Sequence, residues 1–524
     1  MSFIDMCLFI KHYNSFGSYM MKKHIFTVIL AVLLLSQTLV ACSEAGSNDT
    51  QETKPTNQSA GNETTEEIDT ENLTDYEKRQ LIPDDLPDAN FNGAEFRVLT
   101  SNNSGYSTIG SGLYEIVVDE LNGDACNDSV YNRNIDIEER FNVKIAGEAV
   151  DSPETQVNTF VTAGTNDYHI VGFHNWLAKT PISNKSLYNW KLVNNVNLDK
   201  PWHNQLANNA ATINNTLYAV CSDLAITSMT YTYAFFFNVD KIADYGYTPD
   251  SLYDIVKSGG WTIDKVIEMT NEMYEDTNGN GTRDVTDNYG FGYAIVNPAD
   301  VWLAAFDQPL CQVTPDNQIE ITFMTDKTVS IYEKLLDWHY NTDGFYKYPT
   351  QYDEEKYFLS GNLVMAPLRF YAAYNKLREM EDTYSILPYP KWDTEQENYY
   401  TNADDKFTAF GFPLTSYGEI EFVGTIFEAL CAESYKQVYP VYYDTALKGK
   451  YSSDPHTAEM IDLIMAGRNF DFSFEWGETF QQLPYFIRRE LDGQKTSIAS
   501  DYKKVAKAMA KSIDKKILPL YGVE

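Results

Sequence analysis

The feature that most constrains the fold is an alternation of strand-like and helix-like segments in the first half of the chain. The strand-like segments are rich in β-branched and aromatic residues, and they are AEFRVLT, VKIAGEAV and DYHIVGF at residues 94–100, 143–150 and 167–173. The two segments between them, residues 127–142 and 152–164, repeat apolar residues every three or four positions, as an amphipathic helix does. Strands joined by single helices through short turns pair in parallel. The sequence therefore predicts an α/β lobe.

The same alternation restarts after an aromatic run, YTYAFFFN at residues 231–238, which we interpret as a buried strand near a crossing between lobes. A helix is expected at 261–274, with Thr262 as its N-cap. A second helix is expected at 327–340, with one face formed by Val329, Tyr332, Leu336 and His339. Strand-like segments lie at 289–296, 363–370 and 384–390, the segment 407–414 carries the chain back, and the end of the chain is helical around 456–467 and 502–518.

The chain has 524 residues, which is too many for one ordinary core, so at least two lobes are expected. We divide it as follows: a signal peptide at 1–41, a linker at 42–85, a first lobe at 86–230 and 405–440, a second lobe at 231–404, and C-terminal helices packing on the lobes at 441–524.

The N-terminal region has the pattern of an export signal. Lys22 and Lys23 precede an apolar run at 25–35, which is too short to span a membrane as a helix. The true start is expected at Met20 or Met21. The tetrapeptide Leu-Val-Ala-Cys ending at Cys42 resembles the lipobox of bacterial lipoproteins. That resemblance implies cleavage before Cys42 and lipid anchoring to the outer face of the cell membrane, whereas an ordinary cleaved signal is the alternative.

Charge narrows the possible partners of the protein. The formal net charge is −35, which argues against nucleic acid and against binding to anionic membranes by charge. Residues 43–72 contain almost no large apolar side chain, so they cannot offset the entropy of ordering and are expected to form a disordered tether.

Beyond the lipobox, the cysteines form no metal or redox motif. None of them makes a CxxC pair, and their spacings are wide: Cys126, Cys221, Cys311 and Cys431. Export permits disulfides, but buried free thiols are the favoured expectation.

The order of several motifs resembles the extracellular solute-binding proteins of ABC transporters, family 1. The motifs are VYNRNIDIEERFNV, AGTNDYHIV, LYAVCSDLAI, FFFNVDKIADYGY, GGWTIDKVIEMTNEMYEDTNGNGTRD, FLSGNLVMAP and YSILPYPK, and they cover most of residues 90–395. The resemblance implies a two-lobed periplasmic-binding-protein-like α/β fold of type II, with strands crossing between the lobes and a ligand cleft between them. It also implies a monomer that closes on a sugar or oligosaccharide and is recognised by a permease.

A short acidic loop has the spacing of an EF-hand. Positions 1, 3, 5, 7, 9 and 12 of this loop are Asp276, Asn278, Asn280, Thr282, Asp284 and Asp287. Gly281 stands at position 6, where the backbone turns sharply. Ca²⁺ takes six to eight oxygen ligands, which this spacing supplies, although position 12 is Asp where Glu is usual. A polar turn without metal is the alternative. A calcium ion here would clip a helix to a strand within the second lobe, outside the ligand cleft.

Candidate ligand residues follow from the resemblance and from the rule that ligands bind at the carboxyl ends of parallel strands. After the first and third strands they are Asn102, Asn103, Phe173, Asn175 and Trp176. Near the crossing they are Asp223, Tyr231 and Tyr233, and after the segment LVMAPL they are Arg369, Phe370 and Tyr371. We expect Trp176 and Tyr371 to contact the same sugar ring, because sugars stack on aromatic platforms. The other large aromatics, Trp261, Trp302 and Trp338, are expected in the lobe cores.

An anchored glycoside hydrolase is the main alternative function, and a surface protein that captures glycans without a permease is another. A hydrolase would need two carboxylates across a cleft, and the 75 acidic residues leave room for such a pair. The chain has no GxSxG, HExxH or P-loop motif. We therefore expect a non-catalytic binding protein.

Overall fold

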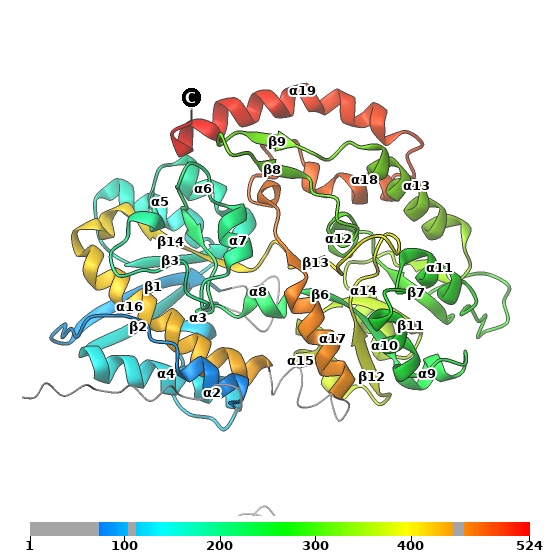
Figure 1. Cartoon of the computed structure of the whole chain (residues 1–524), viewed down its shortest axis with the longest axis horizontal. Coiled ribbons are helices and arrows are strands. Elements are labelled where there is room, and N and C mark those ends of the chain that lie inside the picture. Colours follow the sequence, from blue (N-terminus) through cyan, green and yellow to red (C-terminus); the bar gives the residue numbers. More distant parts are fainter. Residues whose placement is uncertain (1–72, 103–111, 444–454, 524) are drawn as a thin grey trace, which may run out of the picture. The chain divides into compact units, whose positions relative to one another are not determined.

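The computed structural model describes residues 73–102, 112–443 and 455–523 (Figure 1). The chain divides into two units, residues 1–68 and 69–524, and all described residues belong to the second unit. The predicted signal peptide, Cys42, the greater part of the predicted linker and Asn103 therefore lie outside the described residues. No helix in the described ranges is long and apolar enough to cross a membrane.

The first lobe is built on a mixed sheet with the strand order β2-β1-β3-β14-β4, and β5 also pairs with β14. Its strands are β1 (Ala94–Ser101), β2 (Val143–Val150), β3 (Ile170–His174), β4 (Leu187–Tyr188), β5 (Ala219–Val220) and β14 (Thr408–Pro413). The pairs β1–β2 and β1–β3 are parallel, as the alternation of strands and helices predicts. The late strand β14 returns from the second lobe and pairs antiparallel with β3.

Local sequence explains the two helices that connect the parallel strands. Asp124 caps α4 (Ala125–Phe141) by accepting hydrogen bonds from the first backbone amides. Proline occupies the first position of α5 (Pro153–Ala163), and Gly164 ends it with a φ of 72°. The other helices of this lobe are α2 (Asp75–Gln80), α3 (Gly112–Ile116), η1 (Asn175–Leu177), α6 (Lys179–Ser183), η2 (Trp190–Leu192), α7 (Gln205–Ala210), α8 (Thr227–Thr230), η5 (Leu414–Glu419), α16 (Ile420–Glu433) and η6 (Ser434–Val438).

The second lobe is built on a sheet with the order β10-β7-β11-β6-β12. Its strands are β6 (Tyr233–Asn238), β7 (Tyr289–Tyr293), β10 (Phe345–Lys347), β11 (Leu363–Arg369) and β12 (Tyr384–Leu387), and a hairpin is formed by β8 (Cys311–Val313) and β9 (Ile319–Ile321). Every residue of β6 is buried, as the aromatic run predicts. The predicted core tryptophans Trp261, Trp302 and Trp338 are fully buried in this lobe, so that prediction is confirmed.

The helices of the second lobe are α9 (Val239–Ala243), α10 (Pro249–Lys257), α11 (Ile263–Asn271), η3 (Asn297–Asp300), α12 (Val301–Ala305), α13 (Asp326–Asn341), α14 (Asp353–Leu359), α15 (Phe370–Asn375) and η4 (Leu377–Glu379). Thr262 caps α11 as predicted. The predicted face of α13 is confirmed in part. Tyr332 and His339 are buried as predicted, whereas Val329 and Leu336 are only partly buried and the face also includes Ile331, Leu335 and Trp338.

Two described segments and the C-terminal region link the lobes. Ala403 forms an antiparallel bridge with Thr232, and the Asp404 amide donates to the Tyr231 carbonyl at 2.9 Å. Strand β13 (Thr401–Asn402) pairs with β15 (Arg468–Asn469), which follows α17 (Pro455–Ala466). The last elements are η8 (Phe472–Phe474), η9 (Leu483–Tyr485), α18 (Phe486–Asp492), α19 (Ile498–Lys516) and η10 (Leu518–Tyr521).

The C-terminal elements contact both lobes. Helices α18 and α19 pack on α13 of the second lobe, and Figure 1 shows α19 along the upper edge of the view. The end of the chain then reaches the first lobe, where the Tyr218 hydroxyl donates to the Leu520 carbonyl at 2.8 Å. The cysteines at 126, 221, 311 and 431 are buried free thiols, as expected.

Candidate ligand-binding site

The place where the chain crosses between the lobes holds a buried cluster of charges. Arg369, at the end of β11, lies 3.5 Å from Asp404 and 3.6 Å from Glu355, measured from guanidinium nitrogen to carboxylate oxygen. Its guanidinium also lies over the rings of Tyr231, Tyr352 and Tyr371 at 5.1, 5.0 and 5.7 Å. A buried arginine keeps its charge when carboxylates and aromatic faces surround it. The cluster therefore ties the end of a second-lobe strand to the crossing segment.

Asp404 remains ionised within this cluster. Burial by itself would raise the pKa of Asp404, but Lys406 and Arg369 outweigh burial and hold the pKa at about 2. The Asn297 amide donates to the same carboxylate at 2.9 Å. Asp405 differs, because burial and the neighbouring Asp404 charge raise its pKa to about 7. Two adjacent carboxyls thus have opposite shifts, and only Asp404 is held firmly as an anion.

Beside this cluster lies a hollow of about 840 Å³, measured out to its open mouth, which we call the Trp176 hollow. Its walls come from both lobes and from the C-terminal region. The lining residues are Trp176, Lys179, Asn297, Gln351, Asp405, Lys406, Phe474, Gly477, Glu478, Gln482, Tyr485 and Arg488. This mixture of aromatic and polar side chains suits a small organic ligand.

Hydrogen bonds hold the polar side chains of the hollow in place. The Arg488 guanidinium donates to Asn297 at 3.0 Å and to Asp300 at 2.9 Å, and it lies over the Tyr485 ring. The Tyr485 hydroxyl donates to the Asp405 carboxylate at 2.5 Å. These contacts fix the planes of the guanidinium and the phenol before any ligand arrives, which lowers the entropic cost of binding.

One contact joins the two sides of the hollow directly. Lys179 of α6 forms an ion pair with Glu478 of the C-terminal region at 2.8 Å, and the Glu478 side chain is 73% exposed. An exposed pair contributes little to stability. It can therefore open and close at small energetic cost, and it marks the rim of the hollow.

Trp176 is the aromatic surface of the first-lobe wall. The strand β3 ends at His174, and η1 then carries Asn175 and Trp176 across to the crossing segment, where the Trp176 amide donates to the Asp405 carbonyl at 3.1 Å. The indole Nε1 is buried and has no hydrogen-bond partner among the described residues. A buried indole N–H without a partner costs free energy, so a ligand acceptor that reaches it would be favoured.

The predicted site residues fall into distinct groups. Trp176 lines the Trp176 hollow, and Asn175 lines a second hollow, whose walls also come from both lobes. Asn102 follows β1, and its side-chain amide donates to the Asp151 carboxylate at the surface. Asn103 lies outside the described residues. The structure thus brings one predicted residue after the third strand into the Trp176 hollow.

Two predicted aromatic residues belong to the cores instead. Phe173 is 1% exposed and packs in the largest hydrophobic cluster, and Phe370 is 0% exposed and packs in another. Neither lines a hollow identified in the described part of the chain. The reason is geometric, since strand alternation and the first turn of α15 point these rings inward, and sequence position near a strand end does not determine that direction.

The remaining predicted residues support the site rather than line its main hollow. Tyr371 is 4% exposed and packs edge-on against Tyr231, so Trp176 and Tyr371 do not line the same hollow. Arg369 belongs to the buried charge cluster, and Tyr233 lines a small void beside it. Asp223 lines none of the hollows identified in the described residues, and burial raises its pKa to about 7.

Several lining residues were not predicted from the sequence. Gln351 precedes α14, Lys406 precedes β14, and Tyr485 and Arg488 lie near the start of α18. None of them follows a strand of the predicted parallel pattern. Tyr485 and Arg488 reach the Trp176 hollow because the C-terminal region folds back onto the crossing segment. No local sequence pattern predicts that contact.

The acidic loop at 276–287 lies between α11 and β7, as predicted. The Asp276 carboxylate accepts from the amides of Gly279 and Gly281 at 2.8 Å each, and both glycines have positive φ. Asp287 is fully buried, and its Oδ1 has no hydrogen-bond partner in the described structure. Within the described ranges no group of three or more His, Cys, Asp or Glu side chains is placed to hold a metal, so amide and carbonyl oxygens would have to complete the ligand set.

Comparisons with known proteins bear on the fold. No protein-family model matches the chain, and no curated protein matches it either. Among solved structures, the chain is similar to one described as a cyclo/maltodextrin-binding protein complexed with maltotetraose. The TM-score is 0.54 at 12% identity, and the match covers 81% of this chain and 98% of the other. The predicted two-lobed α/β fold is therefore confirmed.

Proposed function

We propose that the protein is a solute-binding receptor that holds a sugar or oligosaccharide in the Trp176 hollow. The observation that carries this proposal is Trp176 itself, an aromatic platform with an unpartnered N–H, in a wall that also holds Lys406, Gln351 and Arg488. Sugars present apolar C–H faces and a ring of hydroxyls, which such a wall can stack on and bond to. The similar solved protein is complexed with maltotetraose, which supports a carbohydrate as the first ligand class to test.

The proposal extends to a role in import. A receptor of this kind passes its solute to a permease after closing, so the closed form must bind the solute more tightly than the open form does. The lipobox at Cys42 and the acidic segment behind it support attachment to the outer face of the cell membrane through a flexible tether.

A carbohydrate library screened by calorimetry tests the first step. We expect one ligand per chain, bound unchanged, with compaction in small-angle scattering on binding. The carbohydrate assignment fails if only peptides or ions bind. Conversion of a bound oligosaccharide into shorter products would instead establish a hydrolase, and binding without any permease partner would favour a glycan-capture protein.

We also propose that the loop at 276–287 holds Ca²⁺ in a structural role. The unpartnered and buried Asp287 Oδ1 is the supporting observation, because a buried carboxylate oxygen without a donor is costly unless a cation neutralises it. The side chains that would hold the ion are Asp276, Asn278, Asn280, Asp284 and Asp287, together with the Thr282 carbonyl. The ion would supply charge compensation and clip α11 to β7. Equal melting temperatures with excess calcium and with chelator would contradict this.

A further inference from the structure

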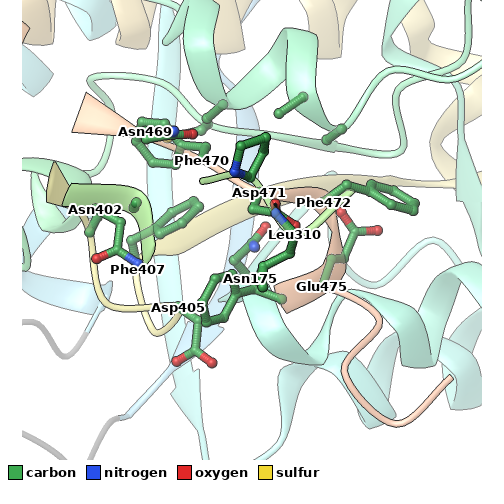
Figure 2. Close-up of a pocket in the computed structure, with 18 of the residues that line it drawn as sticks. Asn175, Leu310, Asn402, Asp405, Phe407, Asn469, Phe470, Asp471, Phe472 and Glu475 are labelled. Atoms are coloured by element: carbon green, nitrogen blue, oxygen red, sulfur yellow. Dashed lines mark hydrogen bonds between the residues drawn. The ribbon is translucent and has the colours of Figure 1, made fainter. Parts of the chain in front are cut away.

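A second hollow lies on the other side of the crossing segment, and we call it the Phe470 hollow (Figure 2). It contains about 770 Å³ of empty space, measured out to its mouth. Its walls are α7 and β5 of the first lobe, α12 and residues 308–310 of the second lobe, residues 402–407 of the crossing segment and residues 469–475. Asp405 borders both hollows, but in Figure 2 its carboxylate points away from Phe470, and it is bonded to Tyr485 of the Trp176 hollow.

The lining of the Phe470 hollow differs chemically from that of the Trp176 hollow. Most of it is apolar, with rings from Phe407, Phe470, Phe472 and Phe474 and small faces from six alanines. The described lining includes four acidic residues, Asp300, Asp405, Asp471 and Glu475. No Lys, Arg or His is among its described lining residues, whereas the Trp176 hollow has Lys179, Lys406 and Arg488.

Two acceptors in this wall are left without donors. Asn402 is 8% exposed, and its Oδ1 has no partner in the described structure. The Asp300 side chain is 6% exposed; its Oδ2 accepts from Arg488, but its Oδ1 has no partner in the same residues. Both residues also line a smaller void of about 220 Å³ that adjoins the Phe470 hollow, together with Tyr233, Asn297 and Phe474. The void thus forms a polar end to an otherwise apolar hollow.

The chemistry of this end favours a donor that carries positive charge. An ammonium group has three N–H donors and no acceptor, so it matches acceptors that lack donors. Aromatic faces attract a cation within about 6 Å of the ring. Burial raises the pKa of Asp300 well above its ordinary value although Arg488 favours its anion, so a further positive charge beside this carboxyl would be favourable. An anionic ligand would meet four carboxyls and no cationic side chain among the described lining residues.

We propose that the Phe470 hollow is a second binding site, which takes a small organic amine as its ammonium ion. The apolar body of the ligand lies among the phenylalanine rings, and the charged head lies at Asp300 and Asn402. Apart from Asp405 and Phe474, which border both hollows, its lining differs from that of the Trp176 hollow. Its ligand class also differs, and its occupation requires no carbohydrate.

The probe for this proposal is 2-phenylethylamine, compared with 2-phenylethanol and phenylacetate by calorimetry on the folded protein. We expect saturable binding of one amine per chain, binding of the neutral alcohol at least about ten-fold weaker because one charged hydrogen bond is lost, and no binding of the acid. Equal binding of amine and alcohol, or no binding of the amine at millimolar concentration, would overturn the proposal.

Three substitutions locate the bound amine. Ala304→Phe fills the hollow from α12, and Ala211→Leu fills it from the end of α7, so each should abolish amine binding. Asp300→Asn should weaken amine binding about ten-fold and leave the alcohol unaffected. The exposed Glu333→Gln removes one charge elsewhere and should change nothing. If Ala304→Phe does not fold, Ala211→Leu serves as the test. Wild-type amine affinity in either variant, once it is shown to be folded, would show that the amine binds elsewhere.

Discussion

Arg369 and Asp404 form a buried ion pair, with Nη1 and Oδ2 separated by 3.5 Å and side chains only 4% and 1% exposed. Arg369 ends a strand of the second-lobe sheet, whereas Asp404 precedes a strand of the first-lobe sheet. The pair therefore joins two elements that belong to different lobes. Any motion between the lobes must either preserve this contact or turn about it.

Removing the charge of Asp404 should destabilise the folded protein strongly. Asp404→Asn keeps the volume but leaves Arg369 with Glu355 as its remaining carboxylate partner. Breaking a buried pair typically costs about 3–5 kcal/mol, because an uncompensated charge remains. Urea unfolding followed by circular dichroism measures the loss. Glu333→Gln, an exposed change of the same charge, should have little effect, and a similarly small effect for Asp404→Asn would show that the cluster is not structural.

Truncating Trp176 should remove carbohydrate affinity and spare the fold. Trp176→Ala deletes the stacking surface and the unpartnered N–H, so we expect at least about ten-fold weaker binding of any carbohydrate found by screening. Trp392→Ala serves as the control, since this partly buried tryptophan packs on Phe306 and Lys334 away from the hollow. The site assignment is wrong if both variants bind equally well.

Much of the fold could be predicted because its determinants are local. The parallel strands β1, β2 and β3 are apolar runs separated by helices with a 3.6-residue period, and buried β6 is an uninterrupted aromatic run. The face of α13 was predicted imperfectly because apolar residues surround most of that helix. Trp338 points inward because it packs on the rings of Phe291, Trp302 and Phe345, which come from other segments of the second lobe.

The site was less predictable because it is built from distant segments. Trp176 follows a parallel strand, where a general rule places ligands. Arg488 comes from a helix more than 300 positions later, and nothing in its neighbourhood distinguishes it from a surface arginine. Tyr371 lies where a stacking residue was expected, but its ring packs against Tyr231 and is buried. Side-chain direction depends on such tertiary contacts.

Calcium should raise the stability of the second lobe through Asp287. If Ca²⁺ binds only the folded state, excess calcium raises the melting temperature by mass action, and chelation lowers it. Asp287→Asn removes the buried negative charge that the calcium ion would neutralise. The substitution should therefore abolish this response. Asp316→Asn, in the exposed turn between β8 and β9, should keep it. A calcium response that survives Asp287→Asn would place the ion elsewhere.

Glu354 should make stability decline as pH rises. Burial raises the pKa of Glu354 from 4.5 to about 8, although the Ala294 amide and Arg369 favour its anion and Glu355 opposes it. Between about pH 5 and 8 the folded state therefore binds a proton that the unfolded state has lost. Stability falls with rising pH by about 1.4 kcal/mol per unit for one such carboxyl. Glu354→Gln should flatten this part of the profile in urea titrations at pH 5 and pH 8, and an unchanged slope would contradict the assignment.

Cys42 should decide where the protein resides in the cell. Lipidation of its sulfur after cleavage would attach the chain to the membrane, because a buried acyl chain contributes about 0.8 kcal/mol per methylene and two chains give stable anchoring. Cys42→Ala removes the acceptor sulfur, so the protein should appear in the medium or remain as an unprocessed precursor. Ser43→Ala, one residue later, retains the sulfur and should fractionate like the wild type. Normal processing together with unchanged membrane fractionation in Cys42→Ala would show that the lipobox resemblance is accidental and that attachment, if any, has another cause.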